Sequence, residues 1–309
     1  MSSQALISVN NLTRYYGDNC AVNDISFELA AGDILGFLGP NGAGKSTTMQ
    51  MLSGNLAPSR GEILINGIDL LDRPGAAKSA LGYLPEVPPL YREMNVDEYL
   101  RYCAKLRRIS KAGIGDAMEL AKLRCGLTAV GKRLIGNLSK GFQQRVGIAQ
   151  AILHSPQIII LDEPTVGLDP IQIREIRELI TELGESHGII LSTHILPEVE
   201  SVCNRVQIIN AGKLVYASDM KDLLEQHATG RFEISLGNPP GVDELRATDL
   251  IDSVEQLDAN SFIVHITSTA DRLAAVAVNN NWELRKLVAH EHSLEHIFVN
   301  LTLGDEEIV

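Results

Sequence analysis

The sequence predicts an α/β fold with a mostly parallel sheet, a helical insertion and a small α+β module near its C-terminal end. Three observations support this prediction. Residues 157–161 form a near-continuous apolar strand, as expected in a parallel sheet covered on both faces. Residues 93–153 instead repeat apolar side chains at helical spacing, with Val96, Leu100 and Cys103 as the clearest series. Residues 230–309 alternate short strands and helices.

The first part of the chain alternates short strands with turns, because Gly and Pro separate its apolar runs. The strands expected between residues 5 and 92 are 25–29, 34–38, 63–65 and 81–84. Residues 157–216 return to a strand–helix–strand order. Their expected elements are strand 157–161, amphipathic helix 171–183 and buried strand 188–192.

A short helix running into a turn at residues 218–231 indicates a domain boundary near residue 229. The elements expected beyond it are strand 232–236, helix 242–247, strands 251–257 and 261–266, helix 271–279 and strand 282–288. This order is typical of a split βαβ module. A last helix, 294–301, places four apolar side chains on one face.

The charge of the chain is unevenly distributed. The net charge is −12, and residues 231–309 hold 5 Lys/Arg against 14 Asp/Glu, a balance of −9. Because nucleic-acid phosphates require clustered positive charge, we do not expect nucleic acid as a partner. The N-terminal residues do not resemble a signal peptide, and no apolar run approaches about 18 residues, so we expect no membrane-spanning segment. Four scattered cysteines suit free thiols in a reducing compartment.

Residues 39–47, GPNGAGKST, match the phosphate-binding pattern G-x-x-x-x-G-K-[ST]. The loop follows an apolar strand and precedes a helical stretch, 47–52, which is the context that this motif requires. Glycines let backbone N–H groups turn toward phosphates, and the helix N-terminus adds positive potential. Lys45 can bridge the β- and γ-phosphates, and the Ser46 hydroxyl can bind Mg²⁺. The predicted nucleotide-binding residues are Gly39, Pro40, Asn41, Gly42, Ala43, Gly44, Lys45, Ser46 and Thr47.

An acidic pair, Asp162 and Glu163, ends the apolar strand at residues 157–161. A carboxylate at a strand tip beside a phosphate loop can hold Mg²⁺, usually through water. The next carboxylate can orient and deprotonate an attacking water. An exposed acidic pair without chemistry is the alternative, and the phosphate loop in the same chain favours the catalytic interpretation.

The order and spacing of the motifs resemble those of ATP-binding-cassette (ABC) ATPases over about residues 5–220. Residues 138–145, LSKGFQQR, resemble the family's signature sequence, and residues 164–170, PTVGLDP, resemble the loop after its catalytic glutamate. His194 matches the switch histidine. Tyr16 matches the aromatic residue that stacks on adenine.

This resemblance implies an α/β, P-loop NTPase fold of ABC type with an antiparallel β subdomain. The ABC domain would span residues 1–229, with a helical subdomain at about 93–153, and residues 230–309 would form an accessory α+β domain. The implied reaction is hydrolysis of ATP with Mg²⁺, in which Lys45 and Mg²⁺ neutralise the phosphates, Glu163 activates water and His194 holds the geometry.

The resemblance also implies two partners. In an ATP-sandwich homodimer, Ser139 and Gly141 of one copy reach the γ-phosphate bound by the other, and Asp169 lies in the loop beside that site. The second partner is a polytopic membrane permease, which places the chain at the cytoplasmic face of the membrane. The helical insertion and residues 87–93 would transmit motion to that permease, so substitution of Leu90 or Tyr91 is expected to uncouple transport.

The sequence departs from the usual family pattern at three positions. Glu86 stands where a glutamine usually contacts Mg²⁺, so it is a candidate ligand with an added negative charge. Lys140 replaces the first signature glycine, and Phe142 replaces the signature glutamine. These departures and the accessory module resemble the subgroup that serves gliding-motility, copper-processing and drug-export systems, which favours export.

Several alternatives remain at this point. A soluble ABC ATPase acting on ribosomes or DNA is one, although the chain has one cassette and no heptad insertion. A P-loop kinase is a more distant one. Tyr16 can be a core aromatic, and His194 can cap a strand end. Residues 292–296, HSLEH, fit the H-x-x-E-H zinc-protease pattern, but the apolar stripe of the same helix favours a structural role.

Overall fold

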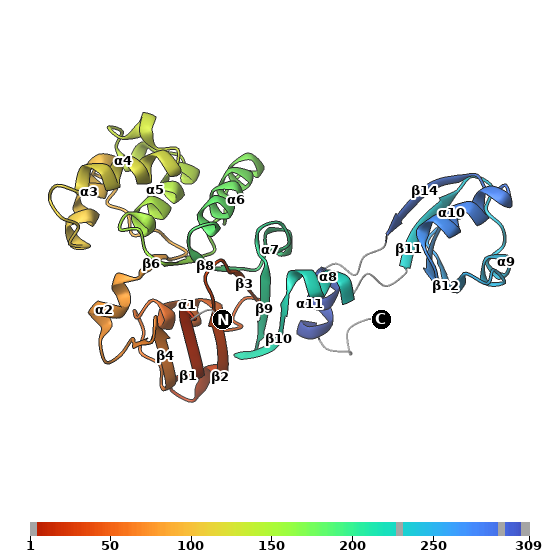
Figure 1. Ribbon diagram of the computed structural model, residues 1–309, viewed down its shortest axis with the longest axis horizontal. Helices are drawn as coiled ribbons and strands as arrows, with labels where there is room; N and C mark the ends of the chain where they lie inside the picture. The colour runs from red at the N-terminus through yellow and green to blue at the C-terminus, as the bar shows by residue number, and fades with distance from the viewer. Residues whose placement is uncertain (1–4, 227–230, 290–293, 304–309) are drawn as a thin grey trace. The chain divides into compact units, whose positions relative to one another are not determined.

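The computed structural model describes residues 5–226, 231–289 and 294–303. The chain separates into two compact units (Figure 1), a larger one of residues 1–220 with 301–309 and a smaller one of residues 221–300. The boundary expected near residue 229 falls on residues 227–230, which lie outside the described part of the chain.

The larger unit contains a six-stranded sheet in the order β10-β9-β3-β8-β7-β6. Its strands are β3 Ile34–Leu38, β6 Leu81–Leu84, β7 Ile158–Asp162, β8 Gly188–Thr193, β9 Arg205–Asn210 and β10 Lys213–Asp219. All neighbours pair in parallel except β10, which pairs antiparallel with β9. Every residue of β3, β7 and β8 is buried, as the apolar runs predicted. The prediction of a mostly parallel sheet is therefore confirmed.

A second, antiparallel sheet of the larger unit has the order β2-β1-β4-β5. Its strands are β1 Ile7–Tyr16, β2 Asn19–Leu29, β4 Arg60–Ile65 and β5 Ile68–Asp69. Sequence patterns missed β1 and the first half of β2. The register of β1 shifts between Val9 and Leu12, and Asn11 within this bulge has a φ of 49°. Such a bulge interrupts the period-2 alternation by which strands are recognised.

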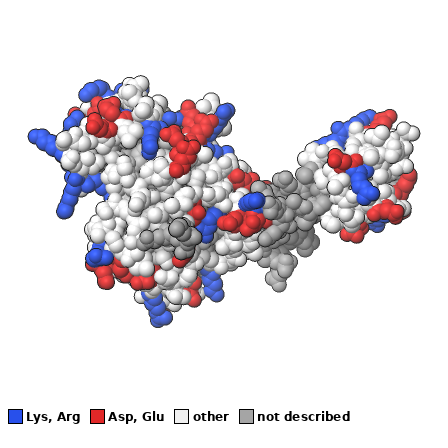
Figure 2. Space-filling model, in the orientation of Figure 1, with Lys and Arg blue, Asp and Glu red and all other residues white. Residues whose placement is uncertain are grey.

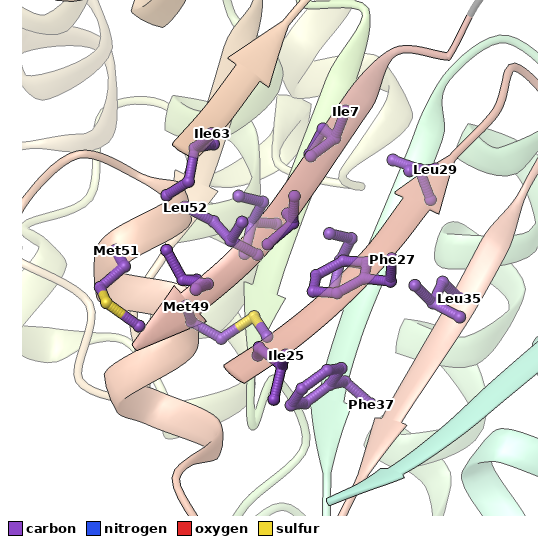
Figure 3. Packing of buried hydrophobic residues seen from close by; sticks show 14 of the residues in the cluster. Ile7, Ile25, Phe27, Leu29, Leu35, Phe37, Met49, Met51, Leu52 and Ile63 are labelled. Carbon is purple, nitrogen blue, oxygen red and sulfur yellow. The ribbon is translucent and has the colours of Figure 1, made fainter. Parts of the chain in front are cut away.

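The core of the larger unit lies between the two sheets and helix α1, Lys45–Leu52 (Figure 3). The Phe27 ring on β2 lies 5.8 Å from the Phe37 ring on β3, joining one sheet to the other. Met49 and Leu52 of α1 are fully buried in the same cluster. Because close-packed interiors resist displacement, this core fixes the strand and the helix between which residues 39–44 lie.

The remaining helices of the larger unit are α2 Pro74–Ser79, α3 Val96–Leu106, α4 Ile114–Arg124, α5 Lys140–Ile152, α6 Pro170–Gly184 and α7 Leu196–Val202. The three from α3 to α5 confirm the helical pattern predicted for residues 93–153. Helix α3 begins with a capping box, in which Asn95 accepts from the Glu98 amide and Glu98 accepts from the Asn95 amide. Helix α2 was not predicted, because six residues are too few to show a helical period.

The smaller unit contains a four-stranded sheet in the order β12-β13-β11-β14, in which all neighbours are antiparallel. Its elements run β11 Arg231–Leu236, α9 Val242–Arg246, β12 Ile251–Gln256, β13 Ser261–Ile266, α10 Ala270–Asn279 and β14 Leu284–Ala289. This is the strand and helix order expected of a split βαβ module. Trp282 was expected to open the last strand, but it lies before β14 and is buried in the unit's core.

Two further helices flank this module in the sequence, α8 Met220–Gln226 and α11 Leu294–Leu303. Acidic and basic side chains are interspersed on the face of the module that Figure 2 shows, so its net negative charge does not form a single-sign patch there.

The zinc-protease pattern at residues 292–296 falls partly on residues outside the described ranges. Among the described residues, no helix is long and apolar enough to span a membrane.

Candidate functional site

The loop between β3 and α1 requires glycine at two positions. Gly44, directly before α1, has a φ of 109°, and a Cβ there would lie 2.5 Å from the carbonyl oxygen of Ala21. A Cβ on Gly39 would lie 2.4 Å from the carbonyl oxygen of Ile209. Neither position has room for a Cβ atom, so the backbone itself lines this end of the sheet. Its N–H groups are therefore available to bind an anion.

Lys45 begins α1 and is held inward, with only 6% of its surface exposed. Its ammonium donates to the carbonyl oxygens of Gly39, at 2.7 Å, and Pro40, at 3.2 Å. Burial lowers the pKa of Lys45, and the negative charges of Glu163, Asp162 and Glu86 oppose that lowering. The three carboxylates thus favour the charged ammonium in a site that otherwise disfavours it.

Asp162, the last residue of β7, is 2% exposed. Burial raises its pKa, and Glu163 and Glu86 raise it further, whereas the hydroxyls of Ser192 and Ser46 act in the opposite direction. Within the part of the chain that the structure describes, Asp162 Oδ1 has no hydrogen-bond partner. A buried carboxylate oxygen without a partner is costly, and hard cations such as Mg²⁺ prefer oxygen ligands. The donor set around Asp162 therefore fits a divalent cation.

Glu163 and His194 form a hydrogen-bonded pair at the ends of two neighbouring strands. His194 Nδ1 lies 2.9 Å from Oε1 and 3.0 Å from Oε2 of Glu163. The same carboxylate lies 3.9 Å from Lys45 Nζ. Glu163 has a φ of 49°, and its backbone N–H donates to Ser192 at 2.8 Å. A non-glycine residue in this conformation stores strain that the surroundings must hold, which is frequent at functional sites.

A cavity of about 480 Å³ brings most of the predicted site residues together. The predicted residues in its lining are Asn41, Gly42, Gly44, Lys45, Ser46, Thr47, Glu86, Glu163 and His194. Asp162 lies buried next to Glu163, and Gly39 and Pro40 contribute the carbonyl groups that hold Lys45. Ala43, within the loop, is buried. Ala21 and Val166 also line the cavity, and sequence reasoning missed both.

Tyr16 does not line this cavity, yet it is not a core residue either. It ends β1 with 45% of its surface exposed, and the Arg14 guanidinium lies 4.9 Å from its ring centroid. The structure therefore excludes the core-aromatic alternative for Tyr16. An exposed ring face remains accessible for stacking.

The signature residues also lie outside the cavity of their own chain. Ser139 caps the N-terminus of α5 and accepts from the Phe142 amide at 3.4 Å. Asp169 caps α6 and accepts from the Ile171 and Gln172 amides at 3.0 and 2.9 Å. Gly141 packs against the Gln172 side chain, where a Cβ would lie 2.5 Å from Oε1.

Comparison with known proteins shows a consistent likeness. The sequence profile of the ABC transporter family matches residues 22–166. The bacitracin transport ATP-binding protein BcrA of Bacillus licheniformis is 35% identical over 97% of this chain and 98% of its own length. An uncharacterised ABC transporter ATP-binding protein of Bacillus subtilis, YxlF, is 36% identical over 75% of this chain and 77% of its length. The chain belongs to the ABC transporter ATP-binding protein family.

Solved structures of ABC ATP-binding subunits share the fold. One ATP-binding subunit of an ABC transporter superposes with a TM-score of 0.65 at 34% identity, over 72% of this chain and 92% of the other. The cbiO1 protein of Clostridium perfringens, part of the transporter complex cbiONQ, superposes with a TM-score of 0.66 at 28% identity and the same coverage. As an ABC transporter ATP-binding subunit, the chain binds and hydrolyses ATP. The likeness to transporter subunits supports the transporter interpretation over a ribosome- or DNA-directed ATPase.

Proposed function

We propose that the chain hydrolyses ATP in the cavity beside Glu163, as one of two copies that drive export through a membrane permease. One observation carries this proposal. The Glu163 carboxylate lies between the Lys45 ammonium and the His194 ring, at the point where the phosphate loop meets the end of β7. A base, a cation and a histidine that line one cavity are groups that phosphoryl transfer to water uses.

The chemistry follows from these positions. Glu163 accepts a proton from water as the water oxygen forms its bond to the γ-phosphorus. The bond from that phosphorus to the β–γ bridging oxygen breaks, and ADP and inorganic phosphate leave. Lys45 stabilises negative charge on the phosphate oxygens. His194 Nδ1, 2.9 Å from Glu163 Oε1, keeps the carboxylate oriented toward the space that the water enters.

Mg²⁺ fits the same site, and we assign Ser46, Asp162 and Glu86 as the residues that would hold it. The unpaired Asp162 Oδ1 supports this assignment, as do the hydroxyl and carboxylate oxygens that surround it. When bound, the cation would neutralise charge on the β- and γ-phosphates. Glu86 adds its negative charge to those of Asp162 and Glu163, which increases the attraction for a divalent cation.

A homodimer accounts for the location of the signature residues. Ser139 is exposed and lies with Gly141 at the N-terminus of α5, outside the cavity that contains Lys45. Backbone N–H groups at a helix N-terminus bind anions. Two copies facing one another can therefore place each α5 N-terminus against the ATP bound by the other copy. Light scattering should show an ATP-dependent dimer that Ser139→Ala weakens, and a monomer at saturating ATP would contradict this arrangement.

A surface of the larger unit suits a permease segment. A cavity of about 550 Å³ is lined by Tyr83, Pro85, Pro89 and Arg107, among others, so it adjoins the loop that begins at Glu86. Tyr91 lies in this loop and is 44% exposed. A short permease helix in this groove would contact both the loop after Glu86 and the helical insertion, which supports the predicted path of transmission.

The Tyr91 side chain is held in place by two aromatic neighbours on α3. Its ring makes edge-to-face contacts with Tyr99, at 6.2 Å, and with Tyr102, at 5.6 Å between centroids.

The predicted direction of transport, export, rests on the resemblance of the sequence to the gliding-motility, copper-processing and drug-export subgroup. BcrA, named for bacitracin transport, aligns with 97% of this chain, the smaller unit included. This alignment supports a role of the whole chain in transport.

Copurification tests the proposal. The tagged chain is extracted from its host's membranes in mild detergent, and the proteins that accompany it are identified by mass spectrometry. We expect a polytopic membrane protein in an amount nearly equal to that of the tagged chain. Tyr91→Ala should lower the amount of this membrane protein, whereas the control Arg174→Ala, at an exposed position on α6, should not change it. Recovery with ribosomes or nucleic acid and without a membrane protein would overturn the transporter role and leave the ATP site intact.

A further inference from the structure

A buried carboxylate on α7 has no part in the chemistry described above. Glu198 is 1% exposed, and both of its oxygens accept hydrogen bonds from threonine hydroxyls. Thr165 donates to Oε1, and Thr193 donates to Oε2 at 3.0 Å. Both threonines are buried, at 2% and 0% exposure. Among the described residues, no Lys, Arg or His forms an ion pair with Glu198.

The two threonines belong to segments that each carry a group of the ATP site. Thr165 follows Glu163 by two residues, and Thr193 directly precedes His194. Glu163 and His194 are themselves joined at 2.9 Å. These contacts form a closed ring of hydrogen bonds. Glu198 joins the segment after Glu163 to the end of β8, and the side chains of Glu163 and His194 join the same two segments in the cavity.

This ring has a mechanical consequence for Glu163. The residue has a positive φ, and such a conformation persists only where the surroundings fix it. On one side its backbone is held by the carbonyl of Ser192 at 2.8 Å. On the other side, the Thr165 hydroxyl holds the following segment by its hydrogen bond to Glu198. Without it, residues 164–169 lose their side-chain hydrogen bond to α7.

We propose that Glu198 is a positioning residue that keeps Glu163 and His194 at hydrogen-bonding distance, and that it acts through Thr165 and Thr193 without touching nucleotide or water. This inference rests on the proposed roles of Glu163 and His194 in hydrolysis. Displacement of a catalytic group by about 1 Å can reduce turnover on the order of 100-fold. Nucleotide affinity depends mainly on residues 39–47, which Glu198 does not contact, so it should change little.

A purely structural role would give a different pattern of kinetic effects. Loss of a buried carboxylate that only stabilised the fold would lower the melting temperature and leave the turnover of the folded fraction unchanged. A positioning role lowers kcat and leaves the dissociation constant for nucleotide unchanged. Glu198→Gln separates the two further, because its amide can accept from one threonine and donate to the other hydroxyl.

The experiment compares the full-length wild-type chain with Glu198→Ala, Glu198→Gln and a matched control, Asn204→Ala. Asn204 also joins two segments, since it accepts from the Ile34 amide at 2.9 Å and donates to the Gly32 carbonyl at 2.9 Å. Asn204 contacts the first residue of β3, Ile34, whereas the phosphate loop follows the last residue of that strand. Phosphate release gives kcat, and a fluorescent ATP analogue gives the dissociation constant, both well below every variant's melting temperature.

We expect Glu198→Ala to lower kcat by about 10- to 100-fold with nucleotide affinity within about threefold of wild type. Glu198→Gln should recover most of the turnover, and Asn204→Ala should keep it. A kcat for Glu198→Ala equal to that of Asn204→Ala would overturn the inference. So would a parallel loss of affinity and turnover, or a Gln variant as impaired as the Ala variant.

Two further variants keep the outcome decisive. If Glu198→Ala does not fold, Thr165→Val replaces it, because it removes one donor to Glu198 with little change in volume and should lower kcat without changing affinity. Glu163→Gln tests the underlying mechanism. If Glu163→Gln turns over normally, the proposed mechanism is at fault. If only the Glu198 variants are normal, the positioning role alone is wrong.

Discussion

Replacing Glu163 by glutamine removes the negative charge from the centre of the site while keeping the side chain's size. The carboxylate is 7% exposed, lies 2.9 Å from His194 Nδ1 and is 3.9 Å from Lys45 Nζ, so no other described carboxylate has the same two neighbours. General-base catalysis typically contributes on the order of 10²- to 10⁴-fold in rate. At about 1.36 kcal/mol per tenfold change, the barrier to hydrolysis should rise by about 2.7 to 5.4 kcal/mol.

Nucleotide binding should respond differently from turnover in this variant. Glu163 is one of three carboxylates that oppose the lowering of the pKa of Lys45, and Asp162 and Glu86 remain. We therefore expect affinity for ATP within about threefold of wild type, with the larger loss confined to kcat. Loss of the Glu163 charge should lower the pKa of Lys45 further, so its ammonium loses its proton at a lower pH. As pH rises, the variant's affinity for ATP should therefore begin to fall at a lower pH than that of wild type.

The assay is single-turnover release of phosphate with enzyme in excess, with equilibrium binding of a fluorescent ATP analogue measured from pH 6.5 to 9.5. Glu178→Gln is the matched control, because it removes an exposed glutamate whose ion pair among the described residues is with Arg174 on the same helix. The control should keep wild-type turnover. A rate for Glu163→Gln within about threefold of wild type would refute the assignment of Glu163 as the base.

Three further predictions concern the loop, the fold and the permease surface. Gly44→Ala places a Cβ atom on a residue with a φ of 109° and within 2.5 Å of the Ala21 carbonyl oxygen. It should lower the free energy of unfolding by about 2–4 kcal/mol and the affinity for ATP at least tenfold. Urea unfolding and equilibrium binding measure these effects, and wild-type affinity would contradict the prediction. Burial lowers the pKa of His154 to about 4 from 6.5, so the unfolded chain binds more protons between these values. Stability should therefore fall by up to about 3 kcal/mol as pH drops through that window, and His154→Gln should flatten the dependence of melting temperature on pH; an unchanged slope would exclude His154 as the cause. Tyr91→Ala should preserve ATP binding and abolish transport in reconstituted vesicles, and transport at the wild-type rate would exclude a coupling role.

The residues that the sequence predicted best are those whose geometry is local. The phosphate loop lies between a strand and a helix that directly adjoin it, so residues 39–47 carry their own structural context. The acidic pair at the end of β7 is equally local. Four parallel strands, β3, β6, β7 and β8, and the helices of residues 93–153 followed from apolar runs and periodicity, because burial and a helical face leave simple patterns.

The features that the sequence did not reveal depend on contacts between distant segments. Ala21 approaches Gly44 only because β2 packs over the loop, and an alanine carries no signal of such a contact. Glu198 resembles any surface glutamate in the pattern of α7, yet its partner Thr165 lies 33 positions earlier. The β1 bulge removed the alternation that identifies strands. Pairings of this kind are fixed by the tertiary fold and have no period in the sequence.

The larger unit is not one continuous stretch of the chain. Residues 301–303, the last turn of α11, belong to the larger unit, and the carbonyl groups of Leu301 and Thr302 accept from the Asn210 side chain of β9 at 3.3 and 3.4 Å. In chain order the smaller unit is therefore an insert between Met220 and Leu301. A minimal ATPase would be made by excising that insert and bridging the gap with a linker, since truncation after residue 220 would also remove the two carbonyl groups that accept from Asn210.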